Sequence, residues 1–446
     1  MSGAAGEGRF GIVLRLALPS AGELLLGTLV GVVNTYLVGH LGAAPLAAVG
    51  LAFHAAMIGM ILFNAVGTGA TALIARMVGA GDWKGANRVV WQALILAALT
   101  GLVFMVPLEL LAAPILKLLA AEGEVLELGV TYLRIYCSVF AFSSVMYIGN
   151  ACMRGAGDTR TPLLVMAVVN LLNIVVAWLL VNGQFGLPQL GVKGAALGAL
   201  TGRLVGGLMV VGLLLKGRSG LKLRWCDLHI DPGVMRRIAR IGFPVGFEQV
   251  IFRLGMLVYV RLVSSLGTVA FAAHQVALNA ESISFMPGYG FAVAATTLVG
   301  QGLGARDPER AERDAYTAGY LSAGLMSIMG ICFILFPEPL IGFFTTDPEV
   351  IRQGVEPLRL AGLAQPFLAA MMVFGGGLRG AGDTLTPMCI NGSGVWLLRI
   401  PLALLFTRIF PWGLLGIWIA SSLDMVLRGM LLFFLFRRGR WKTAQV

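Results

Sequence analysis

The sequence predicts an all-α polytopic membrane protein, with twelve transmembrane helices in two parallel, pseudo-twofold-related six-helix lobes. Composition is the first reason. Of the 446 residues, 58% are hydrophobic and only 12% are charged, whereas soluble proteins carry about 25% charged residues. The second reason is that the apolar residues form blocks of about 20 to 25, the length that crosses a bilayer core. The third is an internal repeat with a fixed offset.

Twelve apolar blocks are candidate spans. They cover approximately residues 12–38, 46–75, 89–111, 127–152, 162–182, 194–215, 238–264, 270–300, 315–336, 351–377, 387–409 and 413–436. Basic residues gather after the even-numbered blocks, most densely between Lys216 and Arg240. By the positive-inside rule, we expect a multi-pass protein of a bacterial or archaeal cytoplasmic membrane, with both termini in the cytoplasm.

The repeat is read from a ten-residue motif. The sequence MRGAGDTRTP at 153–162 recurs as LRGAGDTLTP at 378–387, so that Arg154 corresponds to Arg379, 225 residues later. The same offset carries Pro19 and Glu23 onto Pro244 and Glu248; beyond the fifth block, an offset of 222 fits better. We therefore expect an N-terminal lobe at 1–215, a cytoplasmic linker at 216–237 and a C-terminal lobe at 238–446.

The duplication indicates a transporter. Because each half has an even number of spans, both halves enter the membrane from the same side, and in such parallel repeats the substrate site lies between the halves and opens alternately to each side. The chain has no Walker, G-x-S-x-G, H-E-x-x-H or C-x-x-C sequence, so we expect no enzyme activity, no bound metal or cofactor, and transport driven by an ion gradient. The net charge is +11, but the basic residues lie between apolar blocks, where they indicate membrane topology. We therefore expect no nucleic-acid partner.

Glutamates within the apolar blocks are the first candidates for ion coupling, because intramembrane charges are costly. Glu23 and Glu248 each stand four residues after a proline, Pro19 or Pro244. Proline frees backbone carbonyls, and a carboxylate beside them can bind Na⁺ or, at low dielectric, H⁺. The alternative is that both glutamates only join helices, paired to backbone or arginine.

The second half carries more polar residues than the first. Arg253 and Glu281 correspond to Thr28 and Ala56, so we place cation or proton coupling at Glu248, Glu281 and Asn279, with a possible Na⁺ site at Glu248. Glu23 is the N-lobe candidate. Arg253 either pairs with a glutamate and releases it on protonation, or simply neutralises it. A polar substrate-facing patch in the N-terminal half is predicted at Asn34, Asn170 and Asn173.

The two motifs have a structural interpretation. Glycine allows a tight turn, Asp158 and Asp383 can cap the following helix, and Pro162 and Pro387 fit its first turn. A gating role, which would include Arg154 and Arg379, is the alternative.

Several motifs together resemble those of the MATE family, the multidrug and toxic compound extrusion transporters. The resemblance rests on the twin R-G-A-G-D-T sequences, VGHLG at 38–42, AAHQVA at 272–277 and LVGQ at 298–301, and it covers nearly the whole chain. It implies a twelve-helix antiporter that exports amphipathic organic cations in exchange for Na⁺ or H⁺. One branch of the family uses an Asp where this chain has Asn34. Another uses a Glu in the seventh span; Glu248 lies in that span, but closer to Pro244 than is expected for the bacterial members of that branch.

Two rival functions remain open at this point. One is a flippase for lipid-linked oligosaccharide or peptidoglycan precursors, from the related superfamily, which would carry more cavity arginines than the one strong candidate, Arg253. The other is an integral membrane enzyme acting on lipids, which would need a clustered nucleophile or metal site. We expect the chain to act as a monomer on small-molecule cations within the lipid bilayer.

Overall fold

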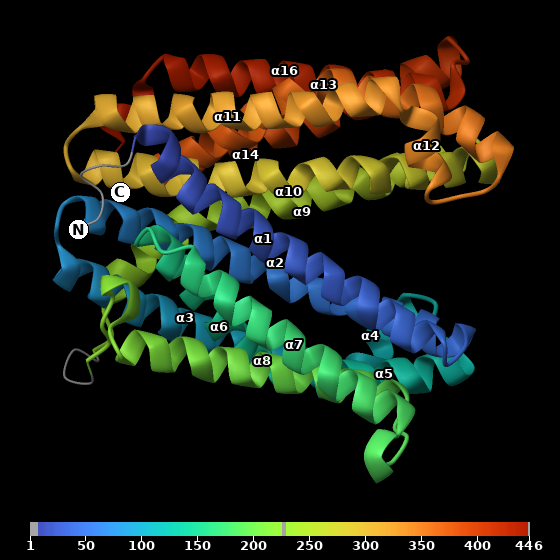
Figure 1. Cartoon of the computed structure of the whole chain (residues 1–446), viewed down its shortest axis with the longest axis horizontal. Helices are drawn as coiled ribbons and strands as arrows, with labels where there is room; N and C mark the ends of the chain where they lie inside the picture. The colour runs from blue at the N-terminus through green and yellow to red at the C-terminus, as the bar shows by residue number, and fades with distance from the viewer. Residues whose placement is uncertain (1–7, 225–228, 445–446) are drawn as a thin grey trace. The chain divides into compact units, whose positions relative to one another are not determined.

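A computed structural model of the chain describes residues 8–224 and 229–444, and every regular element in these ranges is a helix (Figure 1). The first half contains α1 (Arg9–Gly39), α2 (Ala43–Gly79), α3 (Trp83–Leu110), α4 (Ala112–Leu118), α5 (Gly123–Cys137), α6 (Phe140–Gly155), α7 (Arg160–Asn182), η1 (Gln184–Gly186), α8 (Val192–Leu215) and η2 (Arg218–Gly220). The second half contains α9 (Pro232–Ser264), α10 (Thr268–Gly304), α11 (Pro308–Leu335), α12 (Pro337–Gly342), α13 (Pro348–Ala381), α14 (Leu385–Ser393), η4 (Gly394–Arg399), α15 (Ile400–Leu404), η5 (Leu405–Ile409), α16 (Gly413–Arg437) and η6 (Arg440–Thr443).

Within these described ranges, eleven helical segments are long and apolar enough to cross a membrane, and α5 with α6 gives a twelfth if that bent pair is one span. The predicted all-helical, multi-pass fold is confirmed. The predicted span at 127–152 is not straight, because α5 and α6 meet at an angle of 53°. Ser138 stands at this break, and its hydroxyl donates a hydrogen bond to the carbonyl of Ile135, in competition with the backbone hydrogen bonds of a continuing helix.

The chain packs as two compact units whose boundaries fall inside α1 and α9. One unit consists of the described parts of Met1–Ala21 and Pro244–Val446, and the other is the described part of Gly22–Phe243. The beginning of α1 accordingly shares a buried cluster with α10, in which Leu16 and Ala17 meet Phe291. The first turns of α1 thus pack with the second half of the sequence, and those of α9 with the first half. An alignment of the two repeats cannot show this exchange.

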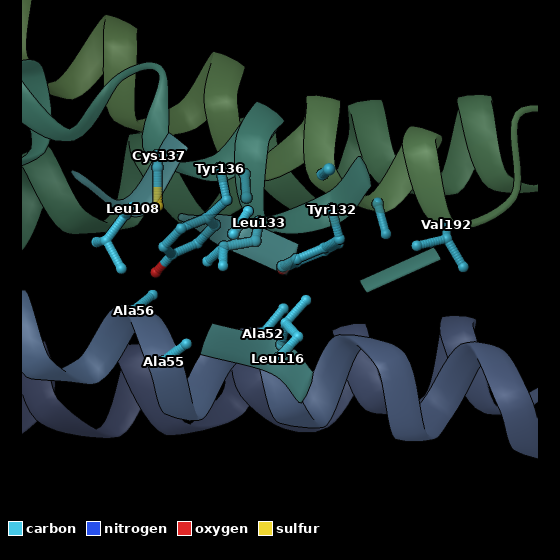
Figure 2. Close-up of a cluster of buried hydrophobic side chains, with 14 of the residues drawn as sticks. Ala52, Ala55, Ala56, Leu108, Leu116, Tyr132, Leu133, Tyr136, Cys137 and Val192 are labelled. Carbon is cyan, nitrogen blue, oxygen red and sulfur yellow. The ribbon is translucent and has the colours of Figure 1, made fainter. Parts of the chain in front are cut away.

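The unit Gly22–Phe243 is built around small residues on α2. One buried cluster joins α2 with α5, and Figure 2 shows Ala52, Ala55 and Ala56 on the side of α2 that faces Leu133 and Tyr136. These alanines let neighbouring helices approach closely, which supplies van der Waals contact where lipid offers no hydrophobic driving force.

The unit containing Pro244–Val446 is centred on α13, which packs against α10, α11 and α16 (Figure 1). One of its spans, Leu385–Ile409, contains the two π-helical segments η4 and η5. The equivalent helix of the first half, α7, is a regular α-helix of 23 residues, whereas the span Leu385–Ile409 has 25. A π-helical turn accommodates an extra residue within a continuous helix, which by itself would raise the repeat offset. The offset falls beyond the fifth block because the next connection is shorter, residues 410–412 in the second half against 183–191 in the first.

The repeat is visible at the level of single contacts. Thr71 donates a 2.9 Å hydrogen bond to the carbonyl of Ala151, and Thr296 donates one of 2.9 Å to the carbonyl of Gly376. The first glycine of each motif lies against the same threonine: a Cβ at Gly155 would be 2.8 Å from the Thr71 carbonyl oxygen, and one at Gly380 would overlap the Thr296 carbonyl. The two halves therefore use the same helix crossing, and the motif needs glycine there because no side chain fits.

We expect Gly380→Ala to destabilise the protein by about 1–3 kcal/mol, since the added methyl must push α13 away from α10. The measurement is the midpoint of thermal unfolding in detergent. Gly375→Ala is the matched control on the same helix, because a Cβ there would meet nothing closer than 3.7 Å. Equal midpoints for the two variants would contradict the packing argument.

Candidate functional site

Both predicted glutamates are paired with the arginine of their own half's motif. The Arg154 guanidinium lies 2.9 Å from each carboxylate oxygen of Glu23, and the Arg379 guanidinium lies 2.7 and 2.9 Å from those of Glu248. Partners are separated by 131 residues in each half. Each pair is largely buried; in the more exposed one, the side chain of Arg379 is 24% exposed and that of Glu248 11%. The repeat therefore duplicates a tertiary ion pair as well as a sequence motif.

The remaining motif residues shape the turn that follows the helix. Gly157 and Gly382 have φ angles of 91° and 93°, a left-handed conformation that favours glycine. Asp158 accepts hydrogen bonds from the Thr161 backbone and hydroxyl at 2.9 and 2.6 Å, and Asp383 accepts the equivalent two from Thr386 at 3.0 and 2.7 Å. Pro162 and Pro387 lie in the first turns of α7 and α14.

Asp158 has one further partner, Ser219 of η2, whose hydroxyl donates at 2.5 Å. Burial works to raise the pKa of the Asp158 carboxyl, but the hydrogen bonds from Ser219, Thr161 and the Arg160 backbone outweigh it and hold that pKa below its ordinary value. The ionised Asp158 thus ties the segment after α8 to the motif of the first half.

The predicted asparagine patch lies in the unit Gly22–Phe243. Asn34 is on α1, and Asn170 and Asn173 are buried on α7. Oδ1 of Asn34, Oδ1 of Asn173 and Nδ2 of Asn170 are buried without a hydrogen-bond partner in the part of the chain that the structure describes.

A cavity of about 360 Å³ lies inside the other unit. Residues of α9, α10, α13, η4 and α16 line it: Phe252, Met256, Tyr259, His274, Leu278, Glu281, Ser282, Phe285, Leu368, Met371, Arg399, Trp418, Ser421, Met425 and Arg428. Most of these side chains are aromatic or apolar, and three are methionines, which adapt to ligands of different shapes. The wall therefore suits a flat or bulky apolar molecule.

Glu281 is the carboxylate in the cavity wall. It is 3% exposed, and its Oε1 has no hydrogen-bond partner among the described residues. His274, on the same helix, is 1% exposed and lacks a described partner at either ring nitrogen. Asn279, predicted beside Glu281, lies on the surface of α10 and outside the cavity wall.

Two arginines line the same cavity and share one aspartate. Nε of Arg399 lies 2.8 Å and Nη2 of Arg428 lies 2.5 Å from Oδ2 of Asp424. The guanidinium of Arg399 also lies 5.7 Å from the centre of the Tyr259 ring, within cation–π range. Sequence reasoning missed Arg399, although an arginine in the middle of an apolar block was a usable signal.

Glu248 and Arg253 line a second hollow of about 450 Å³ along α9, together with Gln249, Phe252 and Met256. Phe252 and Met256 also line the first cavity, so the two hollows adjoin. Arg253 is exposed, and the described contacts pair Glu248 with Arg379 and Asn391 instead.

Comparison with known proteins places the chain among transporters. The family model MatE matches residues 19–179 and 244–405. A probable multidrug resistance protein NorM from Thermotoga maritima is 35% identical over 436 residues, which cover 97% of this chain and 93% of that protein. The multidrug resistance protein MdtK from Yersinia pseudotuberculosis is 29% identical over 97% of this chain and 95% of its own length.

Solved structures share the fold. A crystal structure of MATE in complex with MaL6 superposes with a TM-score of 0.91 at 23% identity and covers 98% of both chains. An outward-facing multidrug resistance MATE transporter of the MOP superfamily gives a TM-score of 0.88 at 22% identity, again over 98% of both.

We expect Asp424→Asn to destabilise the protein by about 3–5 kcal/mol, because it leaves two buried guanidinium groups without their carboxylate. Thermal unfolding in detergent measures the effect. Glu356→Gln is the control, since its pair with Arg359 is exposed and such pairs contribute about 1 kcal/mol or less. An Asp424→Asn variant as stable as the Glu356→Gln variant would show that the aspartate does not compensate both arginines.

Proposed function

Because the chain belongs to the MATE family of membrane transporters, we propose that it is a secondary active multidrug exporter, which moves amphipathic organic cations out in exchange for H⁺ or Na⁺. The names of its relatives, NorM and MdtK among them, support multidrug export. In this proposal the protein acts as a monomer in the cytoplasmic membrane, by alternating access, with both termini in the cytoplasm.

The observation that carries the proposal is the unpartnered carboxylate oxygen of Glu281 in the wall of an otherwise largely apolar cavity. A cavity of about 360 Å³ lies within the size range of sites that hold drug-sized ligands. The rings of Phe252, Tyr259 and Trp418 offer apolar and cation–π contact to an organic cation. Ionised Glu281 supplies the negative charge that such a cation requires.

Charge balance in the cavity supports exchange at one site. The charged and titratable groups that face Glu281 are His274 on its own helix, Tyr259 on α9, Arg399 on η4 and Arg428 on α16, while α13 contributes the uncharged Leu368 and Met371. Both guanidinium groups share the single negative charge of Asp424, so the cluster keeps one excess positive charge, which ionised Glu281 balances. Once a proton, Na⁺ or organic cation neutralises Glu281, a second cation meets uncompensated positive charge, which is costly in a buried site. Occupancy is therefore mutually exclusive, as antiport requires.

The other predicted residues take secondary places in this proposal. Cation binding at Glu248 or Glu23 would have to compete with Arg379 or Arg154, so these pairs are better suited to respond to binding than to perform it. The unpartnered atoms of Asn34, Asn170 and Asn173 support a polar wall for the substrate in the N-terminal half. Arg253 borders Glu248 and adds positive charge to that hollow.

We expect Glu281→Gln to abolish export of tetraphenylphosphonium from proteoliposomes under an imposed pH or Na⁺ gradient. In the wild type, tetraphenylphosphonium binding to purified protein should weaken as pH falls, because protons compete for the Glu281 carboxylate. In Glu281→Gln, binding should be weaker at neutral pH and should no longer fall with acidification.

The controls separate this role from folding. Glu356→Gln, on the surface, should keep both export and the pH dependence of binding. Export by Glu281→Gln at the wild-type rate would remove Glu281 from the coupling role. Wild-type protein that exports nothing under either gradient, but flips a polyprenyl-linked lipid, would replace the exporter proposal with the flippase alternative.

A further inference from the structure

In the unit containing Pro244–Val446, two ionic clusters are joined by a single amide side chain, that of Asn391. The first cluster is the motif pair Glu248–Arg379, and the second is Asp424 with its two arginines. Nδ2 of Asn391 donates to Oε1 of Glu248 at 2.6 Å, and Nη1 of Arg428 donates to Oδ1 of Asn391 at 3.3 Å. A continuous chain of polar contacts thus runs from the cavity wall to the R-G-A-G-D motif, through Arg399, Asp424, Arg428, Asn391, Glu248 and Arg379.

The first half has the motif end of this chain but lacks the rest. Its motif pair, Glu23–Arg154, is present. At the position equivalent to Asn391, the first half has Met166, and at the positions equivalent to Asp424 and Arg428, it has Gly202 and Gly206. The connection from a cavity to the motif is therefore specific to the second half, among the residues that the structure describes.

We infer that Asn391 is a positioning residue that couples the charge of the cavity to the motif arginine Arg379. The inference rests on the proposed role of Glu281. Arg399 and Arg428 carry two positive charges and Asp424 one negative charge. While Glu281 is ionised, its negative charge balances the remaining positive charge. When a cation or proton neutralises Glu281, that balance is lost, and Arg428 is drawn toward the next acceptors, Asn391 and Glu248 behind it.

The geometry of the amide gives the coupling its direction. Asn391 presents its oxygen to Arg428 and its NH₂ to Glu248, and because the amide is planar, the two ends turn together. Movement of Arg428 toward Asn391 therefore shifts Glu248. As the Glu248 carboxylate is drawn toward Asn391 and Arg428, its ion pair with Arg379 weakens. Binding at the cavity loosens the motif at the end of α13.

The ion cluster packs against a glycine close to Asn391. Asn391 stands in α14, three residues before Gly394, which begins the π-helical segment that ends at Arg399. A Cβ at Gly394 would lie 2.6 Å from Oδ1 of Asp424 and would overlap the side chain of Arg428. The ion cluster therefore occupies space that exists only because residue 394 is glycine, next to a helical segment of the irregular kind that often marks functional sites.

The test substitutes Asn391 with the residue of the first half, Asn391→Met, which leaves every charge in place. Asn391 is outside the cavity wall as described, so tetraphenylphosphonium should bind within about threefold of the wild-type affinity, a difference below 1 kcal/mol. The conformational readout is maleimide labelling of Leu385→Cys beside the motif, 59% exposed in this structure, with the five native cysteines replaced by serine.

In the wild-type background, saturating tetraphenylphosphonium should raise the labelling rate about tenfold, a typical size for coupling between two sites. Asn391→Met should bind the cation but show no change in labelling, and its gradient-driven export should fall with kcat reduced and KM nearly unchanged. Asn391→Gln, which keeps the amide, should recover part of the response. Ser393→Met, a polar-to-methionine change on the surface of the same helix, should respond like the wild type.

Each other outcome overturns the inference. A normal labelling response in Asn391→Met shows that the amide carries no coupling. If Asn391→Met loses cation binding as well as the labelling response, Asn391 belongs to the cavity. If Ser393→Met also loses the labelling response, the effect comes from helix packing and not from the amide. If Asn391→Met does not fold, Asn391→Ala is judged by the same criteria. Wild-type protein that does not bind tetraphenylphosphonium refutes the proposed function itself. A wild type that binds the cation and responds, together with an Asn391→Met variant that responds equally, refutes the coupling alone.

Discussion

An ionised side chain inside a membrane protein is costly unless opposite charge and hydrogen bonds compensate it, and this constraint determines where the buried charges of this protein stand. Glu23 compensates Arg154, and Glu248 compensates Arg379. In both halves the pair joins the first long helix to the helix that ends in the motif, just past the point where the first helix passes from one compact unit to the other. Charge compensation thus fixes the register of both helices where the chain changes units.

The same constraint explains why the motif repeats as a block and not as scattered residues. The arginine must reach the glutamate, so the helix that carries it must lie close to its neighbour. The first glycine, Gly155 or Gly380, permits that approach against Thr71 or Thr296, and the second ends the helix in a left-handed conformation. The aspartate then caps the next helix. Each position depends on the one before it.

The fold could be predicted because long apolar blocks and a gapless repeat are properties of the sequence alone. The partners in the ion pairs could not, because residues 131 positions apart meet only after the helices pack. Pairing of Glu23 and Glu248 with arginine was therefore one alternative among others, with no arginine identified. Glu281 was found from its place in an apolar block, but Arg399 was missed. The change in repeat offset indicated that the second half is shorter past its fifth span, yet it did not reveal the π-helical segment that ends at Arg399. The unit boundaries inside α1 and α9 left no sequence signal.

The two halves differ at one equivalent contact, where the sizes of the partners are exchanged. In the first half, Gly202 and Gly206 lie against Val169; in the second, Asp424 and Arg428 lie against Gly394. In both cases glycine on one helix makes room for a larger side chain on the other, so the helix crossing is kept while its chemistry changes from apolar to ionic. An apolar contact has one favourable arrangement, whereas a cluster with two guanidinium groups and one carboxylate can rearrange when a neighbouring charge is neutralised. A duplicated scaffold therefore holds both halves in similar geometry, and the exchange at this contact gives the second half alone a cluster whose arrangement depends on the charge of Glu281.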